Sequence, residues 1–236
     1  MKLNKYYFPR RQLVFVGLFS LFIALGQFNH ALDSTYYRQL PRQNTKSAQD
    51  VILVGNNWDG TIDIYDPNEF KRVKVLDAVP DKAERLDELK SRIDKRVMSW
   101  LIKKLIGKGN HQLVDDMFTS RDGTKIFISR PSFADVVALD THSGKIIWRT
   151  PIEGYRSDHA AISPDGKILL VSASTARKVH AIDTKSGEIV GGFASGDSPH
   201  ENSFSQDGSR IFHASIGRVY LPTSNRFINA LKGDRY

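Results

Sequence analysis

Along most of the chain beyond residue 50, apolar residues alternate with small or polar ones, which is the period of a β-strand with one buried face. These runs come in pairs around Asp-Gly, a dipeptide that supplies the positive φ angles of a tight hairpin turn. Asp-Gly occurs in this setting at residues 122–123, 165–166 and 207–208, with spacings of 43 and 42 residues. One antiparallel unit is therefore expected three times in succession.

Two of the units contain four expected strands each. The innermost strand directly follows residues 115–116 or 158–159, and the other three lie at 125–129, 136–140 and 146–149, and at 168–172, 179–183 and 189–193. A partial copy precedes them at 51–55, 61–66 and 72–76, and a third copy, which begins near 200, lacks the last turn and the outer strand. Four-stranded units that repeat every 40–45 residues or so are typical of propeller blades. The expected fold class is all-β: an incomplete β-propeller of four-stranded blades, with about four blade equivalents and one helical insertion.

Residues 51–236 are thus expected to form a partial propeller, because a closed ring has roughly four to eight complete blades. Unpaired strand edges favour aggregation. Three explanations stay open: the helical insertion caps an edge, two chains complete one ring by self-association, or the chain is a truncated product of a longer propeller.

The insertion spans residues 81–110. Its apolar residues have helical spacing and predict one amphipathic helix, which ends at the glycines of 107–110. The apolar residues are Leu86, Leu89, Ile93, Val97, Trp100, Leu101 and Leu105. We favour an insertion that packs along the side of the propeller or caps its edge over a lid or partner-docking helix. Contact with anionic lipid is disfavoured, because five acidic residues dilute the basic charge: Asp81, Glu84, Asp87, Glu88 and Asp94.

The ends and the charge set the expected location. Residues 1–31 have a basic start followed by an apolar stretch from Leu13 to Leu25, which predicts a signal peptide, with an N-terminal anchor as the alternative. Residues 32–50 are polar and predict a linker. The protein is therefore expected to be exported, periplasmic or extracellular, with membrane contact only through its N-terminal segment.

The net charge of +8 does not indicate a nucleic-acid partner. Residues 1–31 and 81–110 each contribute +4, and the rest of the chain is neutral. A nucleic-acid-binding domain would carry its excess on the folded body. The chain has no cysteine, so thiolate metal sites and disulfides are excluded.

Two family resemblances support the propeller. The run Gly196-Asp197-Ser198-Pro199-His200, followed by Ser-Gln-Asp-Gly at 205–208, resembles the Gly-x-x-Pro-His…Ser-x-Asp-Gly pattern of YVTN-type (YncE-like) β-propeller repeats. The run from Ala138 to Trp148 is similar to the tryptophan-docking motif of pyrroloquinoline-quinone (PQQ) dehydrogenase propellers. In that family the tryptophan packs flat between neighbouring blades.

The YVTN resemblance covers residues 51–236 apart from the insertion, and it implies the fold rather than one function. Relatives that share the repeat include exported binding proteins, haem-d1-type reductase domains and lactonase-like hydrolases. The next copy has Gly191 or Gly192 where the docking tryptophan would be. PQQ is therefore not the expected cofactor.

Six polar residues, two from each copy, line up just before the innermost strand and are the candidate ligand-binding residues, together with Arg156: Asp115, Asp116, Asp158, His159, His200 and Glu201. Imidazole and carboxylate groups suit a divalent metal ion, a cationic ligand or acid–base chemistry. His159 and His200 are the candidate metal ligands, and Arg156 is expected to neutralise Asp158. The favoured interpretation is structural, with these groups fixing the links between blades.

Other histidines and motifs add little chemistry. His180 and His213 lie in expected strands and are interpreted as core or face residues, and His142 lies in a solvated turn. No phosphate-binding loop, nucleophile elbow or Cys/His zinc spacing occurs, so nothing specifies a catalytic residue.

The function expected from these features is that of an exported β-propeller scaffold, rather than an enzyme, that binds a small ligand or a protein partner through loops at the mouth of its channel. The alternatives are an enzyme-type propeller, either a quinone-cofactor oxidoreductase or a metal-assisted hydrolase, and an inactive fragment of a longer propeller.

Overall fold

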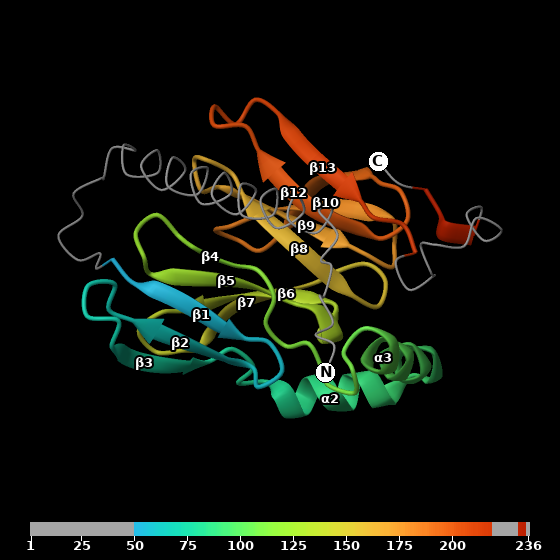
Figure 1. Cartoon of the computed structure of the whole chain (residues 1–236), viewed down its shortest axis with the longest axis horizontal. Helices are drawn as coiled ribbons and strands as arrows, with labels where there is room; N and C mark the ends of the chain where they lie inside the picture. Colours follow the sequence, from blue (N-terminus) through green and yellow to red (C-terminus); the bar gives the residue numbers. More distant parts are fainter. Residues whose placement is uncertain (1–49, 219–230, 235–236) are drawn as a thin grey trace, which may run out of the picture. The chain divides into compact units, whose positions relative to one another are not determined.

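The strands of the protein form four antiparallel sheets that follow one another along the chain (Figure 1). A computed structural model describes residues 50–218 and 231–234. The first sheet holds β1 (Ile52–Asn56), β2 (Thr61–Tyr65) and β3 (Arg72–Asp77), in that order. It is the partial copy expected from the sequence.

The second and third sheets are complete four-stranded units. The second contains β4 (Met117–Thr119), β5 (Lys125–Arg130), β6 (Asp135–Asp140) and β7 (Ile146–Pro151), and the third contains β8 (Ser157–Ile162), β9 (Ile168–Ala173), β10 (Lys178–Asp183) and β11 (Ile189–Ala194). The fourth sheet pairs β12 (Pro199–Phe204) with β13 (Ile211–Ser215). The all-β, propeller-type fold is therefore confirmed, with incomplete first and last units among the described residues.

The Asp-Gly turns are built in the same way in all three copies. In each, a serine hydroxyl donates to the aspartate Oδ1 at 2.6 Å; the pairs are Ser120–Asp122, Ser163–Asp165 and Ser205–Asp207. The same serine oxygen accepts a backbone N–H from the start of the next strand. The repeated sequence thus fixes each hairpin through one local hydrogen-bond pattern.

The turns before the outer strands also repeat. Asp66, Asp140 and Asp183 each accept backbone N–H groups from the residues two and three positions later. These Asx turns confirm that β1 to β3 correspond to the last three strands of a complete unit.

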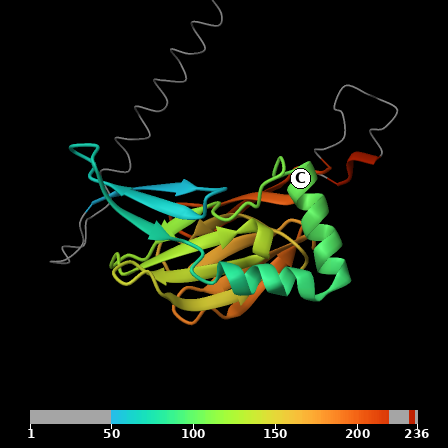
Figure 2. The ribbon, with the colours of Figure 1, turned by 90° about the horizontal axis from the view of Figure 1, so that it is seen from below.

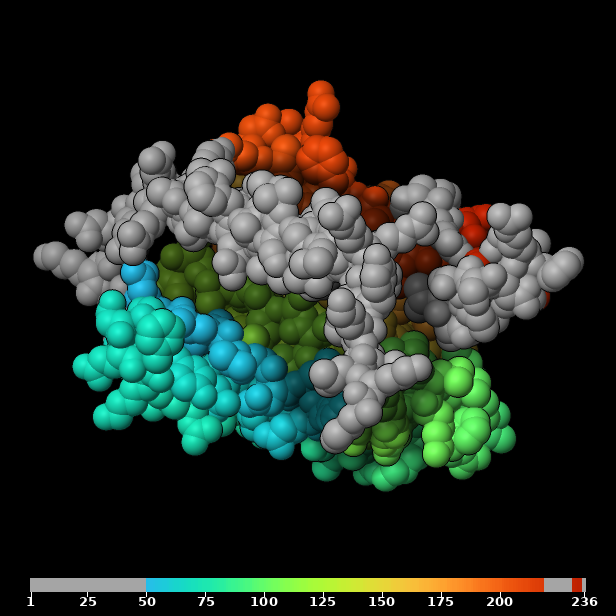
Figure 3. Space-filling view, viewed as in Figure 1, coloured from blue at the N-terminus to red at the C-terminus, as the bar shows by residue number. Residues whose placement is uncertain are grey.

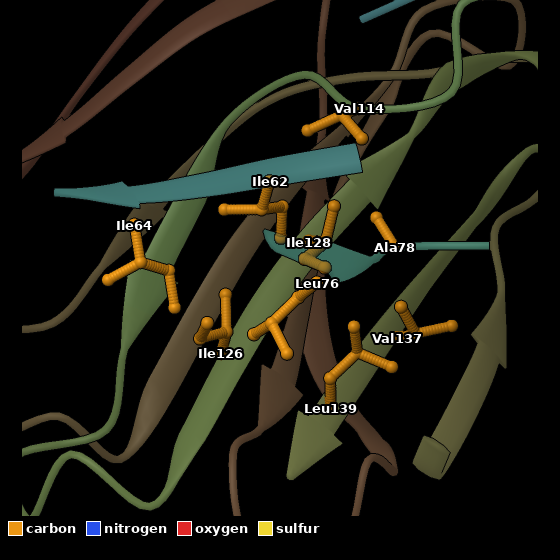
Figure 4. Close-up of a cluster of buried hydrophobic side chains, with 9 residues drawn as sticks. All are labelled: Ile62, Ile64, Leu76, Ala78, Val114, Ile126, Ile128, Val137 and Leu139. Carbon is orange, nitrogen blue, oxygen red and sulfur yellow. The ribbon is translucent and has the colours of Figure 1, made fainter. Parts of the chain in front are cut away.

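The core lies between successive sheets, because strand side chains alternate between two faces. Ile126 and Ile128 on β5 pack toward the first sheet, whereas Phe127 between them packs toward the third. Figure 4 shows the first of these clusters, in which Ile62 and Leu76 meet residues of β5 and β6. The second sheet is therefore buried on both faces.

Trp148 on β7 joins the second sheet to the third. Its ring stacks on Phe127, with centroids 5.7 Å apart and 21° between the planes, and its Nε1 donates to the Thr184 carbonyl at 3.3 Å. Gly187, with φ +78°, lies so close to the indole that a Cβ there would be 2.6 Å from Trp148 Cδ2. Trp148 thus packs between the second and third sheets.

The insertion contains two helices instead of the one expected, α2 (Lys82–Ser91) and α3 (Ile93–Leu105), which Figure 2 shows meeting at a corner beside the sheets. Arg92 separates them with an extended backbone (φ −125°, ψ 140°), and its side chain pairs with Asp94 at the start of α3. Leu86 and Leu89 of α2 pack against Val79, Leu113 and Phe133. The apolar residues that were predicted to share one helix face thus lie on two helices that run in different directions.

A buried ionic group holds α2 to the second sheet; we call it the Arg130 cluster, and it consists of Asp81, Arg85, Glu88, Arg130, Asp135 and Arg149. Arg130 and Asp135 are both fully buried, and Arg130 Nε and Nη2 each donate to Asp135 at 2.8 Å. Arg149 also pairs with Asp135, and it reaches Glu88 of α2 at 3.1 Å. Three guanidinium groups therefore face three carboxylates.

The predicted leader (1–31) and, apart from Asp50, the predicted linker (32–50) lie outside the described residues. Neither helix in the described part of the chain is long and apolar enough to cross a bilayer.

Candidate functional site

The inner strands β8 and β12 are attached to the preceding sheets by equivalent hydrogen bonds. Ser129 Oγ at the end of β5 donates to the Asp158 carbonyl at 2.8 Å, and Ser172 Oγ in β9 donates to the His200 carbonyl at the same distance. Asp158 and His200 therefore occupy equivalent positions in successive units. The alignment of the repeats made from the sequence is confirmed.

Two of the three residue pairs lie inside strands, so the expectation that all of them precede the inner strand is wrong. Only Asp115 and Asp116 precede β4. The register shifts between Ser157 and Ala160 in β8, and between Pro199 and Asn202 in β12, so each strand holds one extra residue against its partner. Such β-bulges redirect side chains and are over-represented at functional sites. The bulges carry the His159 and His200 side chains.

The histidines and aspartates of the three units meet at these bulges; we call Asp115, Asp116, Arg156, Asp158, His159 and His200 the inner-strand cluster. The rings of His159 and His200 have centroids 4.0 Å apart. His159 Nδ1 lies 3.2 Å from Asp116 Oδ2, and its Nε2 lies 4.0 Å from Asp158 Oδ1. His159 is thus held by one carboxylate on each side of its ring.

Asp158 is buried, and its two oxygens face different partners. Arg156 pairs with Oδ2, as expected from the sequence. The Arg156 guanidinium is itself held by Gln112 Oε1, which accepts from Nε at 3.3 Å and from Nη2 at 3.2 Å. Oδ1 of Asp158 is left facing His159.

The electrostatics of the cluster are uneven. Burial and the neighbouring Asp158 raise the pKa of Asp115 to about 6. The hydrogen bond to Asp116 raises the pKa of His159 to about 9, although burial opposes it. Burial lowers the pKa of His200. For Asp116, burial alone would raise the pKa, but the hydrogen bonds from His159 and the Ala160 N–H hold it below its usual value.

Two overlapping sets of side chains have the geometry of a metal site. Asp158, His159 and His200 can each offer one ligand atom, all within 4.8 Å of one another, and so can Asp115, Asp116 and His159. Ligand atoms around a tetrahedral Zn²⁺ lie about 3.4 Å apart, so closing either set requires movements of little more than about 1 Å.

The other sequence-based candidates lie outside the cluster or at its margin. The Glu201 side chain is 58% exposed, and its Oε2 lies 3.8 Å from His159 Nδ1. His180 is buried in β10, as interpreted, but its Nε2 has no hydrogen-bond partner among the described residues. His213 in β13 bonds Ser195 Oγ and Asn202 Oδ1 and is structural, as interpreted. His142 is exposed in its turn.

Three residues that position the cluster were not singled out from the sequence: Gln112, Ser129 and Ser172. The two serines carry a signal, because serine recurs at the same place in all three copies, at 129, 172 and 215. Gln112 has no counterpart in the repeats. It comes from the segment between α3 and β4, which no pattern in the sequence connects to Arg156.

One hollow on the surface lies away from this cluster. It has a volume of about 620 Å³ and lies between β3 and the turn at 142–146, where Lys74 donates to the carbonyls of Thr141 and His142. Its open lining mixes exposed charges with turn backbone, so it offers no convergent set of ligand groups.

Comparisons with known proteins bear on the fold alone. No protein-family model matches the chain, and no curated protein sequence matches it. Among solved structures, the chain is similar to a chain of Kuenenia stuttgartiensis hydrazine synthase, with a TM-score of 0.51 and 17% identity. The match covers 75% of this chain and 44% of that one, so this chain spans less than half of its neighbour's length. At this identity the likeness supports a shared propeller-like architecture.

Proposed function

We propose that the protein is an exported β-propeller scaffold whose inner-strand cluster binds a divalent transition-metal ion, with Zn²⁺ as the representative. The metal ligands in this proposal are Asp158, His159 and His200. Three protein ligands leave a fourth position of a tetrahedral ion open. A small ligand or a protein side chain can take that position, which is how the scaffold would bind its partner.

The observation that carries the proposal is the bracketing of His159. A metal-binding histidine almost always donates its second ring N–H to a carboxylate, a backbone carbonyl or a water molecule, which fixes the tautomer and aims the other nitrogen. Here Asp116 accepts from Nδ1, and Nε2 faces Asp158 Oδ1. Arg156 occupies the other oxygen of Asp158 and leaves Oδ1 for an ion.

His200 supplies the third ligand. Within residues 50–218 and 231–234, no hydrogen bond is made by its ring nitrogens, while its backbone carbonyl is fixed by Ser172. Two imidazoles and a carboxylate are ligands that favour Zn²⁺, Cu²⁺, Ni²⁺ or Fe²⁺ over Mg²⁺ or Ca²⁺. The donor set therefore points to a transition metal.

The test is metal stoichiometry. The full chain, freed of metal by chelation and equilibrated with Zn²⁺, is expected to retain one ion per chain after gel filtration, and His159→Ala and His200→Ala variants are expected to retain none. His142→Ala, in an exposed turn, is the matched control and should bind as the wild type does. Zn²⁺ at 100 times its Kd should also stabilise the wild type by about 2.7 kcal/mol. Equal retention by all four proteins, or by none, would reject the site.

Export is supported by the composition of residues 1–31, which have a basic start and an apolar stretch without acidic residues. It is tested by fractionating cells that produce the full chain. A quinone cofactor has less support, because Trp148, the residue that carries that resemblance, is occupied in packing against Phe127 and Gly187.

A further inference from the structure

The outer face of α3 carries an uninterrupted apolar stripe. Ile93, Val97 and Trp100 follow the i, i+4, i+7 spacing of one helix face, and they are 72%, 52% and 59% exposed. Single exposed apolar residues are normal on protein surfaces, but several together on one face mark an interaction surface. In Figure 3 the helical insertion lies at the margin of the view, outside the sheets.

Basic residues flank this stripe and have no acidic partners. Arg96, Lys104 and Lys108 are exposed, Lys103 is half-buried, and none of the four forms an ion pair within the described part of the chain. Lys104, seven residues after Val97, continues the line of the stripe itself. The outer face of α3, with Lys108 three residues beyond its end, thus combines an apolar strip that includes a tryptophan with four basic residues that form no ion pair within the described part of the chain.

The five acidic residues that dilute the positive charge in the sequence are paired with other basic residues; the exposed Glu84 and Asp87 pair with Arg85 and Lys90. Asp81 and Glu88 are paired in the Arg130 cluster. Glu88 also binds Lys95 at 2.8 Å. Asp94, the acidic residue of α3, is paired with Arg92 and accepts a hydrogen bond from the Tyr155 hydroxyl. The fold therefore separates charges that the sequence mixes.

We propose that α3 docks on an anionic lipid surface, with Trp100, Val97 and Ile93 entering the headgroup region and the four basic residues contacting lipid phosphates. Amphipathic helices that lie in a bilayer interface have this composition, with a tryptophan among the apolar residues and lysines beside them. The complementary charge favours a membrane over a protein partner. Because α2 is fixed to the second sheet through Leu86, Leu89 and Arg149, the contact would hold the propeller in one orientation against the bilayer.

The first experiment measures binding of the full chain to vesicles of phosphatidylcholine alone and to vesicles containing phosphatidylglycerol. Each lysine near an anionic surface contributes enough that Lys103→Glu/Lys104→Glu should weaken binding to the anionic vesicles at least about tenfold. The control, Lys71→Glu/Lys185→Glu, changes the net charge equally on exposed lysines outside the insertion. Residues 1–31 are the same in every variant, so their contribution cancels in the comparison.

The second experiment locates the contact. Brominated lipid should quench the tryptophan fluorescence of the wild type and of Trp58→Phe, but much less that of Trp100→Phe. Equal vesicle binding by the two charge variants, or unchanged quenching in Trp100→Phe, would overturn the proposal. So would a concentration-dependent dimer that Val97→Ser/Trp100→Ser converts to monomer without loss of vesicle binding, because a second copy would then cover the face.

Discussion

The Arg130 cluster and the inner-strand cluster are both gatherings of charge inside the same fold, yet they are built on opposite rules. The Arg130 cluster sets three guanidinium groups against three carboxylates, and its central pair is fully buried. The inner-strand cluster sets one guanidinium, that of Arg156, against three aspartates and two histidines. One of those aspartates has its pKa raised to about 6.

The difference separates a structural role from the binding role that we propose for the inner-strand cluster. A buried ionic network contributes to the fold when every charge is paired. An excess of charge of one sign raises the free energy of the empty site. This repulsion is relieved only when a ligand of the opposite charge binds. The expectation from the sequence that the inner-strand residues serve the links between blades agrees with Asp116, which accepts the Ala160 N–H of the next unit at 2.9 Å. Ser129 and Ser172 make further links of this kind.

The largest effect is expected when one charge of the Arg130 cluster is removed. Arg130→Met leaves Asp135 buried without its bidentate partner, and we expect it to lower the free energy of unfolding by about 3–5 kcal/mol, measured by urea denaturation. Arg72→Met, which removes an exposed pair with Asp63, should change it by less than about 1 kcal/mol. If both variants lost a similar amount of unfolding free energy, the buried pair would contribute no more to stability than an exposed one.

In the inner-strand cluster we expect a smaller change in the free energy of unfolding, of opposite sign. The raised pKa of Asp115 means that the folded state disfavours its charged form, so this carboxylate costs stability increasingly as the pH rises from about 4 to about 6. Asp115→Asn should therefore stabilise the metal-free protein at pH 7 by about 1–2 kcal/mol, after allowance for partial solvent screening. The measurement is the Tm of the chelated protein, with Asp59→Asn in an exposed turn as the control. Destabilisation by Asp115→Asn would place this residue with the structural charges.

The smallest expected effect is a pH dependence of His159. Its folded pKa of about 9 lies above the usual 6.5, so its pairing with Asp116 stabilises the metal-free protein fully below pH 6.5, and that contribution is lost as the pH rises through 9. The imidazole signal of His159 should titrate near pH 9 by NMR, and that of His200, whose pKa burial lowers, below 6.5. Saturating Zn²⁺ should abolish both titrations in the same pH range. If both rings titrated near the usual histidine pKa of 6.5, the electrostatic distinction between the two clusters would be lost.

Much of this fold could be predicted from the sequence, because blades are local structures with local signals. Ser-x-Asp-Gly and the Asx turns at Asp140 and Asp183 set hairpins within a few residues, and strand alternation assigns Ile126 and Phe127 to opposite faces. The sequence repeats also identified the residues that meet in the inner-strand cluster.

The failures concern geometry that depends on distant partners. Nothing near Asp158 or His200 indicates the bulges that put them inside strands, since a bulge is defined against the neighbouring strand. The break at Arg92 divides a regular apolar pattern that reads as one helix. The direction in which Asp81 and Glu88 face follows from arginines at 130 and 149, which are too remote in sequence to predict.

The Ser172–His200 link also has a consequence for the order of folding. The proposed ligands come from two successive units, and His200 is delivered only when β12 docks on β9. Chains emerge from the ribosome N-terminus first, and the earlier sheets can form before this strand exists. A metal ion therefore cannot act as a template for the early blades. In the proposed site the ion would stabilise only molecules whose synthesis has passed β12, and in this way it would distinguish them from shorter chains.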